Sequence, residues 1–273
     1  MEQSSERSSS SAREHNRRAW DALVRNKQRF TTPAPDDDVR DPLGRSDPLG
    51  WLGGSVSGKR LLCLASGGGR QSAIYAAAGA EVTVVDLSPE MLAIDRQVAA
   101  ERGFNIRAIE ASMDDLGVLA DASFDIVLQP VSTCYLPDVR AVYGEVARVT
   151  AAGGLYLSQH KQPTSLQASA TPSPGGYEVT EPYYRQGSLP AVVGSQHREE
   201  GTLEFLHRWE ELLGGLCRAG FVIEDVVEPY LAKPDAPLGA FAHRCQFIPP
   251  YIRIKARRLG AGSANEQRLW LPG

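Results

Sequence analysis

Short apolar runs alternate with helical stretches along the middle of the chain, and this alternation limits the possible folds most strongly. The first run, 60–65, is continuously apolar, as expected for a strand buried on both faces. Strands that alternate with helices form parallel sheets with right-handed crossovers. We therefore predict an α/β fold with a seven-stranded, mostly parallel sheet and helices on both faces. The predicted strands are 60–65, 81–86, 106–109, 124–128, 155–158, 221–227 and 251–256, the last at an edge or antiparallel position.

The predicted organisation has five parts. Residues 1–12 are rich in serine, which predicts a disordered tail, and residues 13–54 form a helix and a proline-rich connector. Residues 55–258 form the main domain, followed by a tail over 259–273. Within the domain, residues 161–200 lose periodicity, and an irregular segment of this length is typical of a lid. A final helix is expected to begin at Thr202.

Composition excludes several classes of protein. The net charge of −4 gives no basic field for nucleic acid. No apolar run resembles a signal peptide or approaches the ~20 residues of a membrane span, so a cytoplasmic location is expected. The cysteines lie far apart, which disfavours a zinc site or disulfide framework; they are Cys63, Cys134, Cys217 and Cys245.

A glycine-rich turn over 66–69 follows the first strand. Such a turn lets backbone N–H groups approach a ligand, because a Cβ would block that approach. Asp86 ends the second strand, where a carboxylate can accept hydrogen bonds from both hydroxyls of a ribose. Taken alone, this pair fits either adenosine cofactor, nicotinamide or S-adenosylmethionine.

Four motifs resemble those of the class I, Rossmann-like methyltransferases that depend on S-adenosylmethionine. They are Leu62–Gly69, Val84–Leu92, Ser123–Val127 and Glu145–Leu155, in the family's order and spacing. The resemblance implies methyl transfer with S-adenosylmethionine as cofactor. A nicotinamide site would need a third small residue where Ser72 stands, and it would leave the later motifs unexplained.

The resemblance also implies a role for each matching residue. The methionine portion of the cofactor would lie against Ala65, Ser66, Gly67 and Gly69, and the ribose would bind Asp86. The adenine would lie between Leu87 and Met91 with its edge at Ser112 and Met113, and its amino group would meet the carbonyl of Gln129.

Three positions depart from the family pattern. Cys63 stands where the family has an acidic residue, and we interpret it as a small core residue. Ala65 stands where the family has its first glycine, and alanine is free of strain there if its φ is negative. Ser112 replaces an acid that contacts adenine.

The acceptor side is expected after the fourth and fifth strands, because ligands bind at the carboxyl ends of strands in open α/β sheets. His160 directly follows the fifth strand. It is either a general base or a loop histidine bonded to backbone. Tyr135, Tyr183 and Tyr184 either stack on a substrate or simply pack. No metal is expected, because Gln129 stands where catechol-type enzymes have a metal-binding aspartate.

These observations favour a methyltransferase that acts on a small molecule, at an O, N or C atom left open. Its partners would be that substrate, with neither nucleic acid nor membrane. A protein or RNA methyltransferase would need a longer groove or a more basic surface. A non-catalytic regulator that binds S-adenosylmethionine is the third hypothesis, because binding motifs do not establish turnover.

Overall fold

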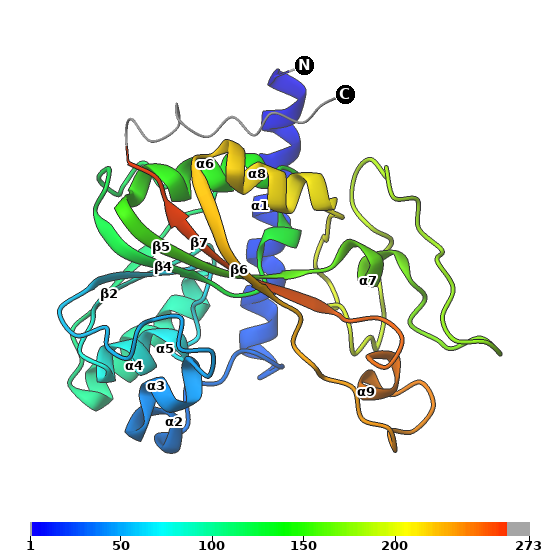
Figure 1. Cartoon of the computed structure of the whole chain (residues 1–273), viewed down its shortest axis with the longest axis horizontal. Helices are drawn as coiled ribbons and strands as arrows, with labels where there is room; N and C mark the ends of the chain where they lie inside the picture. Colours follow the sequence, from blue (N-terminus) through cyan, green and yellow to red (C-terminus); the bar gives the residue numbers. More distant parts are fainter. Residues whose placement is uncertain (1, 261–273) are drawn as a thin grey trace.

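A seven-stranded sheet runs through the protein in the computed structural model, which describes residues 2–260 and their side chains from Ser9 onward (Figure 1). The spatial order is β3-β2-β1-β4-β5-β7-β6. The first five strands pair in parallel, and β7 is antiparallel to both its neighbours. The predicted fold class is therefore confirmed. The strands are β1 (Arg60–Leu64), β2 (Glu81–Asp86), β3 (Ile106–Glu110), β4 (Phe124–Gln129), β5 (Thr150–Lys161), β6 (Phe221–Val227) and β7 (Tyr251–Arg258).

Helices cover both faces of the sheet (Figure 1). Helices α4 (Gln71–Ala77) and α5 (Pro89–Arg102) pack on one face, and their apolar side chains form one core with β1 and β2. On the other face, α6 (Val139–Val149) packs beside the π-helical turn η2 (Glu210–Gly214) and its continuation α8 (Gly215–Arg218). Two buried layers therefore hold the parallel strands and fix where their carboxyl ends meet.

The N-terminal helix α1 spans Glu2–Arg25, so it is longer than predicted. The expected disordered tail over 1–12 is helical from Glu2 in the structure. Nothing in that stretch breaks a helix, because it lacks glycine and proline and because serine lowers helix stability only slightly. The helix also gains tertiary contacts, since Ala12 is buried and α1 packs against α5.

The remaining elements are short and lie outside the two layers. They are α2 (Asp36–Arg40), α3 (Pro42–Ser46), the 3₁₀ turn η1 (Thr133–Tyr135), α7 (Pro163–Gln167) and α9 (Phe241–Arg244). The predicted helix from Thr202 instead begins near Trp209. Residues before it are extended because Phe205 N–H donates to the carbonyl of Cys134 and Leu189 N–H donates to the carbonyl of Glu204. Most of the predicted C-terminal tail, 261–273, lies outside the described residues.

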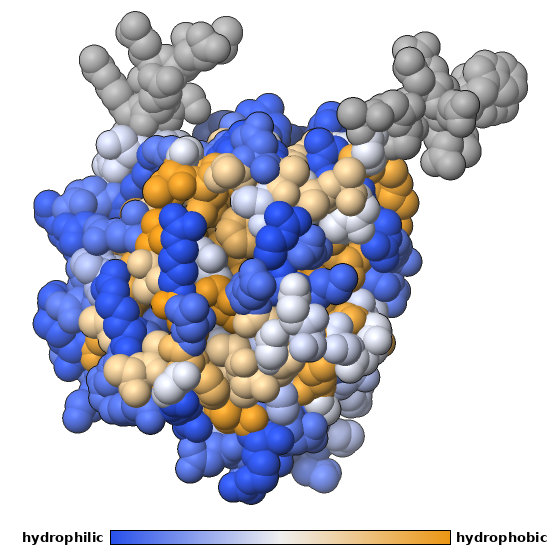
Figure 2. All heavy atoms as spheres, turned by 90° about the vertical axis from the view of Figure 1, so that its left-hand side faces the viewer, coloured by the Kyte–Doolittle hydropathy of each residue, from blue (hydrophilic) through white to orange (hydrophobic). Residues whose placement is uncertain are grey.

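The surface on the side away from α7 and α9 is mixed in character. Hydrophobic residues are interspersed there with hydrophilic ones (Figure 2). Within residues 2–260, we find no helix with the length and apolar character needed to span a bilayer.

Candidate active site

A cavity of about 600 Å³ opens at the carboxyl ends of the parallel strands. Its volume is in the range of small-molecule sites, and its position is the one that open α/β sheets use for ligands. The residues that line it at the strand ends are Ala65, Ser66 and Gly67 after β1, Asp86 and Leu87 at β2, Ala111, Ser112 and Met113 after β3, Pro130, Val131 and Ser132 after β4, and Gln159 in β5. Met91 joins them from α5.

Asp86 is held in place by the glycine-rich turn. Its Oδ2 accepts a hydrogen bond of 2.8 Å from Gly67 N–H, and its Oδ1 accepts one of 2.9 Å from Ser88 N–H. Burial raises the pKa of Asp86, although these N–H groups act to lower it. A Cβ at Gly67 would stand 2.7 Å from Cβ of Met91. The turn therefore needs glycine here so that it can lie against Asp86 and α5.

The other amides of the turn are bound by a second carboxylate, Asp95 of α5. Asp95 is fully buried and accepts hydrogen bonds from Gly68 N–H (2.8 Å), Gly69 N–H (3.1 Å) and the hydroxyl of Ser72. Burial raises its pKa to about 6. A dinucleotide cofactor would need such N–H groups for its pyrophosphate. The turn therefore suits a cofactor without phosphate.

Sequence reasoning missed Asp95, although a signal was present. It follows Met91 by one helical turn, so both side chains point from α5 toward the glycine-rich turn. Met91 was predicted to contact the cofactor next to the glycine-rich turn. An acidic residue four positions later lies on the same face of the helix, so it can also reach the glycine-rich turn.

The three departures from the family pattern have different outcomes. Ala65 has φ +47°, so the condition under which it would be free of strain is not met. The backbone at Ala65 keeps the left-handed conformation that glycine would adopt, because its N–H donates to the carbonyl of Val85 at 2.7 Å. Cys63 is fully buried, and burial raises the pKa of its thiol, as expected for a core residue. The hydroxyl of Ser112 donates to Asp114.

One buried polar atom supports the fit of a cofactor. The hydroxyl oxygen of Ser66 is buried without a well-formed hydrogen bond among the described residues, where the weakly bonding thiol of Cys63 lies near it, and Ser66 lines the cavity. A buried hydroxyl without a well-formed hydrogen bond is costly, so a ligand that bonds to it would stabilise this site.

Helix α1 closes the cavity from above the strand ends. Asn16 donates to the carbonyls of Tyr135 (2.8 Å) and Leu203 (3.0 Å), and its Oδ1 accepts from Leu203 N–H (2.7 Å). Trp20 stands edge-on to Tyr135, with 5.6 Å between ring centroids. Sequence reasoning placed this helix outside the main domain. The sequence did contain an indication that this helix contributes to the cavity, because an asparagine and a tryptophan lie one helical turn apart on a helix that is otherwise charged.

His160 does not line the cavity. It is 1% exposed, and its Nδ1 and Nε2 each lie 2.8 Å from a hydroxyl, that of Thr133 and that of Ser158. Burial lowers the pKa of His160 to about 3. The structure thus corrects both readings of this residue, because it is neither placed against a substrate nor bonded to backbone. Alternation along β5 explains the result, since residue 160 points to the α6 face and Gln159 points to the cavity.

Four further predicted residues also lie outside the cavity lining. The amide of Gln129 is buried, donating to Ser132 Oγ at 2.9 Å and accepting from the hydroxyl of Tyr156. A Cβ at Gly69 would stand 2.9 Å from Val98, so this glycine serves close packing. Tyr183 accepts a hydrogen bond from Trp209 N–H, and Tyr184 is 72% exposed. The predicted substrate role of these two tyrosines is therefore corrected: their segment packs beside η2, away from the cavity.

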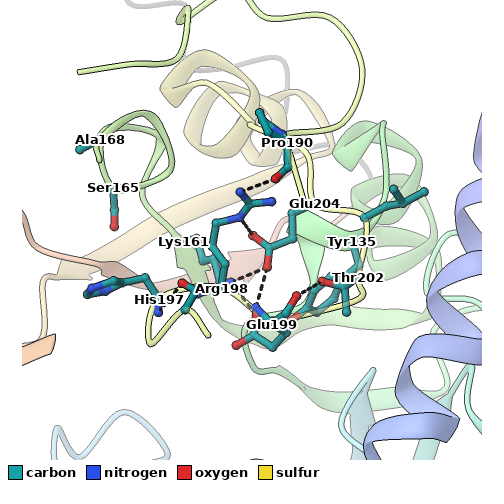
Figure 3. A network of polar contacts seen from close by, with 12 residues as sticks. Tyr135, Lys161, Ser165, Ala168, Pro190, His197, Arg198, Glu199, Thr202 and Glu204 are labelled. Atoms are coloured by element: carbon teal, nitrogen blue, oxygen red, sulfur yellow. Dashed lines mark hydrogen bonds and ion pairs between the residues drawn. The ribbon is translucent and has the colours of Figure 1, made fainter. Parts of the chain in front are cut away.

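From the predicted lid, 161–200, only Glu199 lines the cavity. It belongs to a buried ionic network (Figure 3). Lys161 Nζ donates to Glu199 Oε2 at 2.6 Å and to Glu204 Oε1 at 2.9 Å, and Arg198 Nε donates to Glu204 Oε2 at 2.9 Å. Tyr135, which also lines the cavity, donates from its hydroxyl to Glu199 Oε2 at 2.8 Å.

The network keeps its charges because they are paired. Burial acts to raise the pKa of Glu199, but the Lys161 ammonium and the Tyr135 hydroxyl hold it below its ordinary value. Burial acts to lower the pKa of Lys161, and the carboxylates of Glu199 and Glu204 help to raise it above its ordinary value. Glu199 is therefore an ionised carboxylate at neutral pH.

Comparison with known proteins agrees with this geometry. A family model described as "Methyltransferase domain" matches residues 62–158. The uncharacterized methyltransferase YbaJ of Bacillus subtilis is 33% identical over 228 residues, which cover 78% of this chain and 89% of that protein. A ubiquinone biosynthesis O-methyltransferase of Bordetella pertussis is 33% identical over 139 residues, covering 48% of this chain and 57% of that protein. The crystal structure of an S-adenosylmethionine dependent methyltransferase from Mesorhizobium loti has the same fold, with a TM-score of 0.61 at 24% identity, covering 75% and 93% of the two chains.

The sheet, the cavity at its strand ends and these relatives define a class of enzyme. The chain belongs to the class I S-adenosylmethionine-dependent methyltransferases, and S-adenosylmethionine is its cofactor.

Proposed function

We propose that this enzyme transfers the methyl group of S-adenosylmethionine to a small molecule bound in the same cavity. The observation that carries the proposal is the set of apolar and aromatic side chains that line the cavity beyond the predicted cofactor residues. Phe30, Leu231, Phe241 and Tyr251 line the cavity in addition to the predicted cofactor residues. Apolar and aromatic walls with few polar groups are typical of small-molecule sites.

The cavity is also partly covered in a way that suits a small substrate. Arg29 and Phe30 reach it from the segment after α1, while Leu231 and Phe241 reach it from the segment between β6 and β7. These segments cover part of the cavity, whereas a polymer needs an extended groove. The name of the Bordetella pertussis relative, a ubiquinone biosynthesis O-methyltransferase, supports a small-molecule acceptor.

The predicted cofactor residues keep their proposed roles where they line the cavity. The ribose hydroxyls would bind Asp86, adenine would lie against Leu87 and Met91, and its edge would meet Ser112 and Met113. The methionine portion would lie against Ala65, Ser66 and Gly67. When bound, the cofactor supplies an electrophilic methyl group on a sulfonium.

The protein's own contribution is to hold the acceptor in line with that methyl group and to exclude water. Positioning of this kind converts an encounter in solution into a reaction within one complex, which is a large part of the catalysis available to a simple displacement. The apolar walls and the α1 roof provide both effects.

Calorimetry with S-adenosylhomocysteine tests the cofactor assignment. We expect binding, and Asp86→Ala should weaken it by about 1.5–3 kcal/mol for each ribose bond lost. Asp235→Ala, at an exposed position that does not line the cavity, is the matched control and should leave affinity unchanged. Tighter binding of NAD than of S-adenosylhomocysteine would contradict the assignment.

Formation of S-adenosylhomocysteine with a panel of small hydroxylated and amino compounds, with total protein and with RNA tests the acceptor class. We expect turnover with a small molecule. Methyl incorporation confined to protein or RNA would overturn the proposal.

A further inference from the structure

The unexplained feature of the cavity is a carboxylate in its lining to which no predicted role belongs. Glu199 comes from a segment with little regular structure, yet its side chain is only 16% exposed. Both side-chain hydrogen bonds that it accepts, from Lys161 and Tyr135, end on Oε2. Neither of these two bonds reaches Oε1, and Glu199 lines the cavity. The carboxyl of Glu204 is a further side-chain neighbour of this carboxylate.

The surrounding network fixes this carboxylate in place. Lys161 is the last residue of β5, and its side chain is 4% exposed. Its second partner, Glu204, is completely buried and also accepts from Glu199 N–H at 3.2 Å and from Arg198. Figure 3 shows these side chains converging on one another from β5 and from residues 198–204. Two cations balance two carboxylates, so the network carries no net charge that would attract a cationic substrate.

The neighbourhood of Glu199 also favours a particular substrate body. Tyr251 also lines the cavity, and the charges of Lys161, Glu199 and Arg29 act on its hydroxyl. Phe241, Leu231 and Phe30 are apolar residues of the same cavity lining. An apolar body with a hydrogen-bond donor would therefore satisfy both these apolar residues and Oε1 of Glu199.

We propose that Glu199 is a catalytic residue whose carboxylate accepts a hydrogen bond from the hydroxyl group that becomes methylated. The substrate is then a small apolar molecule that carries this hydroxyl. This inference rests on the proposed function and adds the acceptor group to it. The acceptor oxygen forms the new bond to the methyl carbon while the bond from carbon to sulfur breaks and leaves its electron pair on sulfur. The acceptor's proton passes to Oε1 of Glu199 and then to water.

Glu199 is suited to this step even though its pKa is lowered. As the new bond forms, the acceptor oxygen becomes positively charged and its proton becomes strongly acidic, so a weak base is sufficient. Before the reaction, an ionised Glu199 also accepts a stronger hydrogen bond from the substrate hydroxyl than a neutral Glu199 would. Tyr135 acts as a positioning residue, because it donates only to Oε2.

A matched pair of probes tests this with no need for turnover. The protein is saturated with S-adenosylhomocysteine, and binding of 4-propylphenol and of 4-propylanisole is measured by ligand-detected NMR and calorimetry. A charge-assisted hydrogen bond predicts at least about tenfold tighter binding of the phenol. Glu199→Gln should reduce the preference to within about threefold, whereas Glu200→Gln, at the exposed neighbouring position, should keep it. Tyr135→Phe should also keep it, because Tyr135 does not bond to Oε1.

The outcomes separate this inference from the proposed function. Equal affinity for the two probes in the wild type overturns the inference, as does binding of neither probe. So does a preference that survives Glu199→Gln. The wild-type measurement decides the matter even if that variant fails to fold. Failure of S-adenosylhomocysteine to bind would instead overturn the function on which the inference rests.

Discussion

Replacement of His160 by glutamine should make the protein less sensitive to acid. In the folded chain, burial lowers the pKa of His160 to about 3, whereas the unfolded value is about 6.5. Between these values only the unfolded state carries the proton, so the free energy of unfolding falls as the pH falls below 6.5. The loss from this one residue is about 1.4 kcal/mol for each pH unit, or about 2 kcal/mol at pH 5.

Urea unfolding at pH 7.5 and pH 5 measures the effect. At pH 7.5 the variant should be less stable than the wild type by about 1–3 kcal/mol, because the hydroxyls of Thr133 and Ser158 lose their ring partners. Between the two pH values, however, it should lose about 2 kcal/mol less than the wild type does. His197 and His207, whose pKa values burial also lowers, contribute equally to both proteins.

Two results would refute this reasoning. Parallel pH profiles of wild type and His160→Gln would mean that the ring does not resist protonation in the folded state. Loss of S-adenosylhomocysteine binding in a folded variant would mean that His160 does contribute to the ligand site. We expect that affinity to stay within about twofold of the wild type, because the ring does not line the cavity.

Two other substitutions test the glycine-rich turn. Gly67→Ala places a Cβ 2.7 Å from Cβ of Met91 and 3.1 Å from the carboxyl of Asp86, so it should lower stability by about 1–3 kcal/mol and weaken S-adenosylhomocysteine binding in calorimetry. Its control, Gly144→Ala in α6, meets no atom within 4 Å and should raise stability by about 0.5–1 kcal/mol; equal effects of the two would contradict the packing argument. Ala65→Gly removes the strain of φ +47° at some cost in chain entropy, so urea unfolding should show a gain of up to about 1 kcal/mol, and a loss above that size would show that the backbone is not strained.

Local patterns were sufficient to predict most of the sheet. The boundaries of β1, β2, β3, β4 and β6 agree with the sequence prediction to within one residue. Of these, β1, β2 and β4 are mostly buried. Glycine turns or helix caps bound the strands, such as Ser88, whose hydroxyl accepts from Met91 N–H. The predicted cofactor residues came from the resemblance to the family, and all but Gly69 and Gln129 line the cavity.

The failures of the prediction arise where distant residues decide the structure. Residues 202–208 have the apolar spacing of a helix, but hydrogen bonds to Cys134 and Leu189 keep them extended. His160 was assigned to the correct strand end, but one position along a strand reverses the side that a residue faces. Glu199 had no local signal at all, since its importance comes from Lys161, 38 residues earlier.

The carboxylates that hold the glycine-rich turn have a consequence for protein engineering. Three consecutive backbone amides, from Gly67 to Gly69, are already bonded to Asp86 and Asp95. Substitutions within the turn alone would therefore not convert this enzyme to a cofactor that carries a diphosphate. A designer would first have to remove a carboxylate from α5, where it also bonds to Ser72, and then rebuild the support of the turn. The choice of cofactor in this chain is thus encoded in the helix behind the turn as much as in the turn itself.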